Sequence, residues 1–180
     1  MKIEMAYGKT GMTVDVPEKN LSALLSMRAS APVEDPEGAV TRLLRAPIGG
    51  KPLGELARGK RTACIVVCDI TRPVPNRVIL PSLFNELERA GITRDQVTIL
   101  VATGLHRPST PDELVTMLGE EIASTVRVVS HHAREIGEQR FLGTTPQGTP
   151  VYVDEVYCAA DVKITTGFIE PHLMAGFSGG

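Results

Sequence analysis

The sequence has no tryptophan and few other aromatic residues, with three Tyr and four Phe among 180 residues. Its charges nearly cancel, since 19 Lys and Arg stand against 21 Asp and Glu and leave a net charge of −2. A nucleic-acid-binding surface needs a basic field for the phosphates and, for single strands, aromatic rings on which bases stack. The sequence offers neither, so we expect no nucleic-acid partner.

Long apolar runs and closely placed cysteines are also lacking. Nowhere do about 18 consecutive apolar residues occur, and no apolar stretch follows Lys2, so we expect neither a membrane partner nor a secretory signal. There are three Cys, an odd number. Cys64 and Cys68 fall in one expected strand, which separates their Cα atoms by about 13 Å, whereas a disulfide needs less than about 7 Å. A cytoplasmic protein is therefore expected.

What is present is the composition of a soluble globular chain, with 42% hydrophobic and 22% charged residues. A chain of 180 residues buries enough surface to fold without disulfides or metals. We expect a single α/β domain over residues 1–180, consisting of an N-terminal hairpin and helix (1–60) and a βαβ core (61–180).

The first 60 residues predict a β-hairpin and one helix. Two short strands, 3–7 and 12–16, flank a connection that contains glycines. Asp35 and Pro36 then supply an N-cap and a first-turn proline ahead of apolar residues at helical spacing, and Pro47 ends that helix. A loop leads from there into the main unit.

From residue 61 onward, apolar runs alternate with amphipathic segments. The expected strands cover residues 63–67, 97–102, 126–129 and 162–165, and a turn or hairpin covers 143–153. One helix is expected over 78–90, with Pro81 in its first turn, and another begins at the capping box Thr110–Glu113. The expected fold class is α/β: a mainly parallel sheet with helices on both faces, a Rossmann-like layered domain with an N-terminal β-hairpin.

Polar side chains collect directly after the expected strands. In a parallel sheet these positions meet at one edge, where ligands of open α/β sheets bind. All four His of the protein belong to this set. Its members are Asp69, Thr71, Arg72, His106, His131, His132 and His172. We therefore expect imidazoles, a carboxylate and a guanidinium to share one edge of the sheet.

Several of these residues also have a purely structural interpretation. Asp69 is suited to forming a turn, and Arg72 could either pair with Asp69 or bind an anion such as a carboxylate or phosphate. His106 and His172 lie in expected loops near prolines, where a histidine can simply cap a carbonyl group. The residues alone leave these alternatives open.

Two further features bear on ligand binding. His131 and His132 are adjacent, so in an extended chain they point in opposite directions and are not expected to serve one site. The C-terminal residues Ser178, Gly179 and Gly180 resemble a strand-to-helix loop whose backbone N–H groups cradle a phosphate. No His or Cys spacing typical of a self-contained metal site occurs, so no metal ligand is predicted in the chain.

Together the motifs resemble those of the nickel-dependent lactate racemase family, in the same order. They are Asp-Ile-Thr-Arg-Pro at 69–73, Thr-Gly-Leu-His-Arg-Pro at 103–108, Glu-Pro-His at 170–172 and Gly-Phe-Ser-Gly-Gly at 176–180. The resemblance implies two α/β domains with the active site between them, of which this chain would be most of the first and a C-terminal domain its partner. It further implies a small-molecule hydroxy acid substrate and a nickel-pincer nucleotide, a nickel-carrying pyridinium mononucleotide bound covalently to a lysine just after the Ser-Gly-Gly loop.

The resemblance also implies roles for individual residues. His106 and His172 match the family's two bases, which would move the hydroxyl proton while hydride passes to the cofactor. Arg72 would bind either the substrate carboxylate or the cofactor phosphate. The expected cofactor-binding residues are Asp69, Thr71, Arg72, Ser178, Gly179 and Gly180.

The sequence departs from the family pattern in two places. The tethering lysine would fall just past Gly180 and the nickel-ligating His further on, so we expect a fragment that binds no cofactor stably and is inactive alone. At 130–132, Ser-His-His stands where the family more usually has Asn-His-Asp.

Two other classes of function stay open at this stage. A non-catalytic α/β module would bind a nucleotide phosphate or an anionic metabolite through Arg72 and the C-terminal glycine loop. A metal-free isomerase or hydratase would use the same pair of histidines. Anion binding that survives the loss of both histidines would favour the module.

Overall fold

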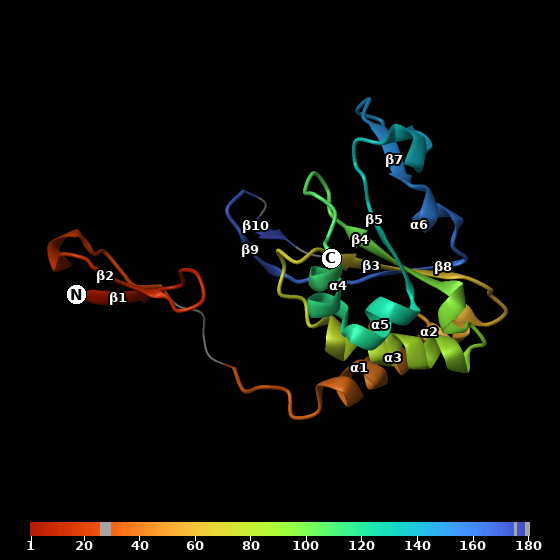
Figure 1. Cartoon of the computed structure of the whole chain (residues 1–180), viewed down its shortest axis with the longest axis horizontal. Coiled ribbons are helices and arrows are strands. Elements are labelled where there is room, and N and C mark those ends of the chain that lie inside the picture. The colour runs from red at the N-terminus through yellow and green to blue at the C-terminus, as the bar shows by residue number, and fades with distance from the viewer. Residues whose placement is uncertain (26–29, 175, 179–180) are drawn as a thin grey trace. The chain divides into compact units, whose positions relative to one another are not determined.

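The computed structural model describes residues 1–25, 30–174 and 176–178 (Figure 1). The chain divides into two units, Met1–Val33 and Glu34–Gly180, and each is described by itself. Among the described residues, no helix is long and apolar enough to cross a membrane.

The first unit contains the predicted N-terminal hairpin. Its strands, β1 (Lys2–Met5) and β2 (Met12–Asp15), pair in antiparallel register. Gly8 and Gly11 in the connection have φ angles of 55° and 77°, a backbone region in which other residues are strained. A short 3-10 helix, η1 (Glu18–Asn20), follows. The predicted hairpin is confirmed.

The second unit is built on a four-stranded sheet in the order β5-β4-β3-β8, whose neighbours are all parallel (Figure 1). The strands are β3 (Ala63–Cys68), β4 (Val97–Ala102), β5 (Arg127–Ser130) and β8 (Val162–Thr165). The register places Ile65 between Ile99 and Ile164. The predicted parallel sheet and its four strands are confirmed.

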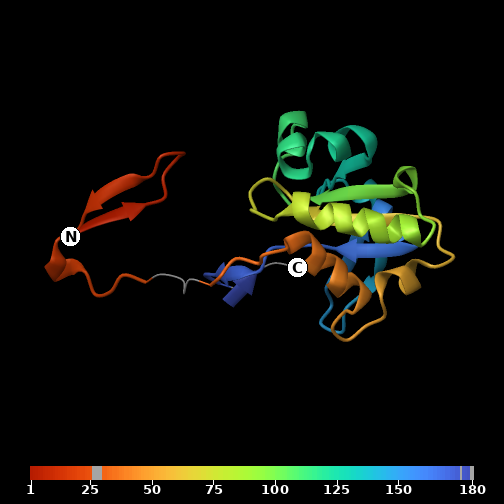
Figure 2. The same ribbon diagram turned by 90° about the horizontal axis from the view of Figure 1, so that it is seen from below.

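Helices cover the sheet face that carries Ile65 and Val67. They are α1 (Pro36–Arg45), α2 (Leu53–Ala57), α3 (Asn76–Arg89), α4 (Pro111–Leu118) and α5 (Glu120–Thr125). Figure 2 shows α3, in yellow-green, lying along the strands. Its side chains Leu80, Phe84 and Leu87 are at most 1% exposed and pack in the same cluster as Ile65. This face contains most of the core.

The opposite face is covered more thinly. The hairpin of β6 (Gln139–Thr144) and β7 (Pro150–Asp154) leads into α6 (Glu155–Ala159), which packs over Cys64 and Leu100. The expectation of helices on both faces is therefore confirmed, although α6 has only five residues.

Local sequence signals explain where the helices begin. The Asp35 side chain accepts a hydrogen bond from the Gly38 N–H at 2.9 Å, so it caps α1 as predicted. The predicted capping box of Thr110 and Glu113 opens α4. α3, however, begins at Asn76, earlier than predicted, because its first turn is built on the carbonyl of Pro75.

The earlier start corrects the placement of Pro81. This proline lies in the second turn of α3 rather than the first. The helix continues through it because proline removes one intrahelical N–H donor and leaves the others in place. The earlier start has no local signal, because Pro75 precedes α3 and no side chain caps the helix there.

The remaining elements are short. They are the 3-10 helices η2 (Arg94–Gln96) and η3 (Ile136–Glu138), and the antiparallel strands β9 (Glu170–His172) and β10 (Gly176–Ser178). Residues 176–178 form a strand paired with β9, so the backbone of Ser178, the first residue of the expected anion-binding loop, lies at the end of that strand. The other two residues of that expected loop, Gly179 and Gly180, lie outside the described residues.

Candidate functional site

A hollow of about 510 Å³ opens at the carboxyl ends of β3 and β4, the edge at which the sequence predicts a site. Its lining comes from the last residue of each strand, from the segments after both strands and from Phe168. The lining residues are Cys68, Asp69, Thr71, Arg72, Ala102, Thr103, Gly104, Leu105, His106 and Phe168. Ligand pockets commonly measure about 300–1,000 Å³, so the hollow is large enough for a small molecule.

Asp69 is the central polar residue of this hollow. Only 6% of it is exposed, and its two carboxylate oxygens have separate partners. Oδ1 accepts from the Thr71 backbone N–H at 3.1 Å and from the Thr71 hydroxyl at 2.5 Å, which closes a turn. Oδ2 lies 2.5 Å from Nδ1 of His106. Asp69 therefore both forms the turn and holds an imidazole.

The charge state of Asp69 fixes the proton on His106. Burial would raise the pKa of Asp69, but hydrogen bonds from Thr71 and His106 outweigh burial and hold that pKa below its usual value. An ionised carboxylate only accepts hydrogen bonds, so Nδ1 of His106 must carry the proton. In the neutral ring this leaves the lone pair on Nε2, where it can accept a proton from a ligand.

The backbone around His106 is held by a tight turn. The His106 N–H donates to the Thr103 carbonyl at 2.9 Å, and Gly104 between them has a φ of 57°. A side chain at position 104 would strain this turn. The His106 side chain itself is 58% exposed, so a held imidazole still faces solvent.

Arg72 forms its ion pair with Glu170 and not with Asp69. Nε of Arg72 lies 3.1 Å from Oε1 of Glu170, which joins the segment after β3 to β9. Nη1 of Arg72 also donates a long hydrogen bond, of 3.4 Å, to the Thr71 carbonyl. The Arg72 guanidinium thus lies at the rim of the hollow, and the carboxylate paired with it is that of Glu170.

His172 lies on the same strand as the carboxylate that meets Arg72. Alternate residues of a strand project to one side, so Glu170 and His172 share a side of β9, about 7 Å apart. Nδ1 of His172 accepts from the Met174 backbone N–H at 3.2 Å. The register places Ser178 of β10 opposite Glu170.

A smaller hollow of about 170 Å³ adjoins His106 on its other side. Its lining includes His131 and His132. Nδ1 of His131 lies 2.9 Å from Oδ2 of Asp154, and Nδ1 of His132 lies 2.9 Å from Oε2 of Glu138. The two adjacent rings take partners on different elements, and both residues line this one hollow. Within the described part of the chain, no three His, Cys, Asp or Glu side chains are grouped to bind a metal.

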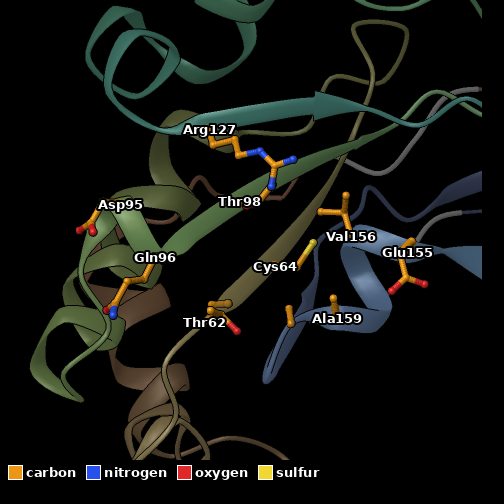
Figure 3. A pocket seen from close by; sticks show the side chains of 11 residues that line it. Thr62, Cys64, Asp95, Gln96, Thr98, Arg127, Glu155, Val156 and Ala159 are labelled. Atoms are coloured by element: carbon orange, nitrogen blue, oxygen red, sulfur yellow. The ribbon is translucent and has the colours of Figure 1, made fainter. Parts of the chain in front are cut away.

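A third hollow, of about 400 Å³, lies at the amino ends of the strands (Figure 3). Figure 3 shows Arg127, Thr98 and Cys64 on neighbouring strands, with α6 across from Cys64. Burial raises the pKa of the Cys64 thiol to about 11, so at neutral pH the thiol is protonated and a poor nucleophile. Among the described residues that line this hollow, there is no acid–base pair like that of Asp69 and His106.

Sequence reasoning did not single out Thr103, Glu170 or Asp154 as individual site residues. Glu170 was visible as part of the Glu-Pro-His motif, and its spacing of two from His172 could have indicated a shared strand side. Asp154 gave no signal, because it lies 23 residues from His131 and meets it only through the fold.

Comparisons with known proteins identify the family of the chain. The lactate racemase N-terminal domain family matches residues 7–180. The chain is 37% identical over 180 residues to a lactate racemase of Thermoanaerobacterium thermosaccharolyticum and 38% identical over 181 residues to one of Lactiplantibacillus plantarum. In each case the match covers 99% of this chain but 42% of the relative, so the chain spans less than half the length of these relatives.

Two solved structures are also similar. The lactate racemase apoprotein of T. thermosaccharolyticum superposes with a TM-score of 0.84 at 36% identity, covering 99% of this chain and 41% of that one. A Thermotoga maritima protein matches with a TM-score of 0.65 at 22% identity over 81% of this chain and 37% of its own, which shows a shared fold alone. On the matched residues and their identity, this chain belongs to the lactate racemase N-terminal domain family.

Proposed function

We propose that the chain is the N-terminal catalytic domain of a 2-hydroxy acid racemase or epimerase that resembles lactate racemase. The observation that carries this proposal is the bond between ionised Asp69 and His106 in a ligand-sized hollow, in a chain of this family. Residues 1–180 would be most of the first of two α/β domains, and the hydroxy acid would bind between that domain and a C-terminal one. The three cysteines are all free thiols, which supports a cytoplasmic location.

The chemistry requires proton transfer to and from a hydroxyl group. Direct removal of the α-proton of a hydroxy acid would build a second negative charge beside the carboxylate. Oxidation to a keto acid avoids that charge, provided a base takes the hydroxyl proton while hydride leaves the α-carbon. Imidazole is the side chain suited to exchanging protons near neutral pH. We assign this role to Nε2 of His106.

Racemisation requires a second base, because the two enantiomers present their hydroxyl groups from different sides. His172 is the second base in this proposal. Its strand also carries Glu170, which pairs with Arg72 at the rim of the hollow, and this connection supports its place near His106. Reduction of the keto acid on its opposite face, with a proton returned by the second imidazole, completes the inversion.

The residues lining the hollow suit the nucleotide part of a nickel-pincer nucleotide. Arg72 and Thr71 offer a guanidinium, a hydroxyl and backbone groups at the rim, suited to a phosphate. Asp69 would help to orient the nucleotide, and Ser178, Gly179 and Gly180 would supply backbone donors. When bound, the cofactor would supply the hydride acceptor.

Arg72 has a second possible ligand in the substrate carboxylate. Its guanidinium has several N–H donors, and the ion pair with Glu170 uses Nε. Nη1 approaches Thr71, and Nη2, which makes none of the bonds found among the described residues, can take an incoming carboxylate or phosphate. Substrate binding at this position would place the hydroxy acid beside His106.

The test uses a chimera that joins this chain to the remainder of the T. thermosaccharolyticum relative. After cofactor occupancy is confirmed, single-turnover reduction of the cofactor is measured with each enantiomer of lactate. Positioned acid–base groups contribute about 10²–10⁴-fold in rate, so His106→Ala and His172→Ala should each lose that much racemisation. Arg72→Ala should mainly weaken the binding of substrate or cofactor.

The same assay separates the competing hypotheses. Racemisation close to the unsubstituted rate in either His variant would make that His a structural residue. A folded chimera that holds cofactor but converts neither enantiomer would contradict the proposed reaction. Anion binding that survives both His substitutions in that inactive protein would favour a binding module instead.

A further inference from the structure

Thr103 is a buried residue that connects two histidines. It follows β4 directly and is 2% exposed. Its carbonyl accepts from the His106 N–H at 2.9 Å, and its hydroxyl donates to the carbonyl of His131. The backbone of His106 is therefore bonded to the peptide carbonyl of Thr103, and the backbone of His131 is bonded to its side chain.

His131 is held from three directions. Its N–H donates to the Val101 carbonyl at 3.0 Å, which continues the pairing of β5 with β4. Its carbonyl accepts from Thr103, and its Nδ1 lies 2.9 Å from Oδ2 of Asp154. Its side chain is only 21% exposed, so the ring is largely covered by its neighbours.

Asp154 anchors this arrangement to the opposite face of the sheet. It is 7% exposed and lies at the end of β7. Its Oδ1 accepts from the Val156 N–H at 2.9 Å and caps α6, while its Oδ2 holds His131. A continuous set of hydrogen bonds thus runs from α6 through His131 and Thr103 to the backbone of His106.

This set of hydrogen bonds ends at His106, whose ring is bonded to Asp69. Nδ1 of His106 lies 2.5 Å from Oδ2 of Asp69, a distance that tolerates little movement of the turn. The His106 side chain is 58% exposed, so packing alone does not fix its position. The turn that bears it must therefore be fixed by backbone bonds, and Thr103 makes one of them.

We propose that Asp154, His131 and Thr103 form a positioning network that holds His106 in the geometry in which its Nδ1 donates to Asp69, which leaves Nε2 as its free acceptor. Asp154 and His131 are positioning residues and touch no substrate. The proposal takes its functional meaning from the proposed function, since it is there that His106 is a base. The geometry it describes is present in the chain by itself.

His132 provides a matched control in the next position. It lines the same 170 Å³ hollow, and its Nδ1 also lies 2.9 Å from a carboxylate oxygen. That pair with Glu138 is exposed, with side-chain exposures of 42% and 53%, and exposed pairs contribute little. No bond joins it to Thr103 among those found in the described residues. Loss of this imidazole should leave His106 unaffected.

The test measures the tautomer of His106 in the chain labelled with ¹⁵N-histidine. Correlations from the ring carbon protons to the ring nitrogens show which nitrogen carries the proton, and His106→Ala assigns the signal. In the unsubstituted chain we expect the proton on Nδ1. In Thr103→Val and His131→Asn the turn is released, and we expect a mixture of both tautomers.

Two variants complete the design. Thr103→Ser keeps the hydroxyl and should keep the proton on Nδ1, whereas His132→Asn should leave the spectrum of His106 unchanged. Far-UV circular dichroism verifies that each variant is folded. If Thr103→Val does not fold, His131→Asn and Asp154→Asn decide the question, since both leave the buried Thr103 in place.

A purely structural role gives a different result. The proposal is overturned if the folded Thr103→Val and His131→Asn chains melt earlier but keep a single Nδ1–H tautomer at His106. It is also overturned if His132→Asn has the same effect as His131→Asn. Because this measurement needs no reaction, an inactive chimera whose His106 tautomer still depends on Thr103 would contradict the proposed function and leave the network intact.

Discussion

The two ends of the parallel sheet each open onto a hollow, yet their chemistry differs. At the carboxyl end, about 510 Å³ is lined by ionised Asp69 and the imidazole of His106, held 2.5 Å apart. At the amino end, about 400 Å³ is lined by the protonated thiol of Cys64 and by Glu155, which already pairs with Arg140. A hollow of ligand size is therefore not sufficient, and the groups held at its wall decide what it can do.

The difference follows from how a parallel sheet is connected. The residues that follow the carboxyl ends of parallel strands all lie at the same edge of the sheet. They are outside the core, but the buried strands before them hold their positions. Asp69 follows β3 and Thr103 follows β4 in this way. Residues before the amino ends instead lead into the buried strands, and Cys64 is already inside the sheet with no exposed surface.

The difference between the two ends of the sheet is tested most directly by replacing an aspartate with asparagine at each end. Asp69→Asn replaces an acceptor by an amide whose N–H₂ group can turn toward His106, so Nε2 loses its lone pair to a proton. In the chimera we expect racemisation to fall about 10²–10⁴-fold. Asp95→Asn, in the hollow at the amino end, should leave the rate unchanged. Equal losses from both substitutions would contradict the distinction between the two ends.

A stability measurement should give the opposite ranking. Cys64→Ser places a hydroxyl among Leu100 and Ala160 at a fully buried position, at a cost of about 1–3 kcal/mol. For a chain of this size each kcal/mol lowers Tm by about 2–4 °C. Cys68→Ser, at the partly exposed carboxyl end of the same strand, should change Tm much less. A larger loss at Cys68 would show that the carboxyl end carries more of the core than its exposure indicates.

The two ends should also lose stability at opposite extremes of pH. The pKa of Asp69 is lowered in the folded state, so its contribution is present above the unfolded pKa of about 3.9 and is lost as the pH falls through the folded value. The pKa of Cys64 is raised from 9.0 to about 11, so its contribution is present below the lower value and is lost as the pH rises between the two. Thermal melts from pH 2 to 11 would show both losses.

Each substitution should flatten one side of that profile only. Asp69→Asn should reduce the acid-side slope and leave the alkaline side as it is, and Cys64→Ala should do the reverse. An acid-side slope that is unchanged in Asp69→Asn would mean that the bonds from Thr71 and His106 do not stabilise the carboxylate in solution.

The fold was predictable largely because the core strands are apolar runs with polar ends. The segment 97–102 is the same in the prediction and the structure, and the caps at Asp35 and Thr110 lie where their side chains indicate. The start of α3 was not predictable from Pro81, because a single proline does not end a helix whose other bonds and buried face persist.

The site was predictable to a smaller extent. The rule for strand ends, together with the motif resemblance, indicated that Asp69 and His106 share an edge, and the structure brings them into contact. Neither the rule nor the resemblance could indicate that Glu170 is the partner of Arg72. Nor could they indicate that Asp154, 23 residues away, holds His131. Such partners depend on register and on the paths of loops, which local sequence does not encode.

The smallest expected effect concerns an exposed ion pair beside the carboxyl end. Arg107, next to His106, donates to Glu113 at 2.6 and 2.8 Å, and this bond, with that from the Thr110 backbone, lowers the pKa of Glu113 to about 2. Glu113→Gln removes the charge but can still accept the Thr110 N–H bond and so keep the cap of α4. We expect a small decrease in Tm at low salt that disappears near 1 M salt, where the screening length is about 3 Å.

Glu113→Ala is the control, because it loses the cap as well and should lower Tm at every salt concentration. Racemisation by the Glu113→Gln chimera should equal that of the unsubstituted one, since the turn of His106 is held by Thr103 and Asp69 rather than by this surface pair. A loss of activity in Glu113→Gln that high salt reproduces in the unsubstituted chimera would show the reverse. The geometry of the site at the carboxyl ends of the strands would then depend on an exposed ion pair. The buried residues Thr103 and Asp69 would not be sufficient to hold the turn of His106.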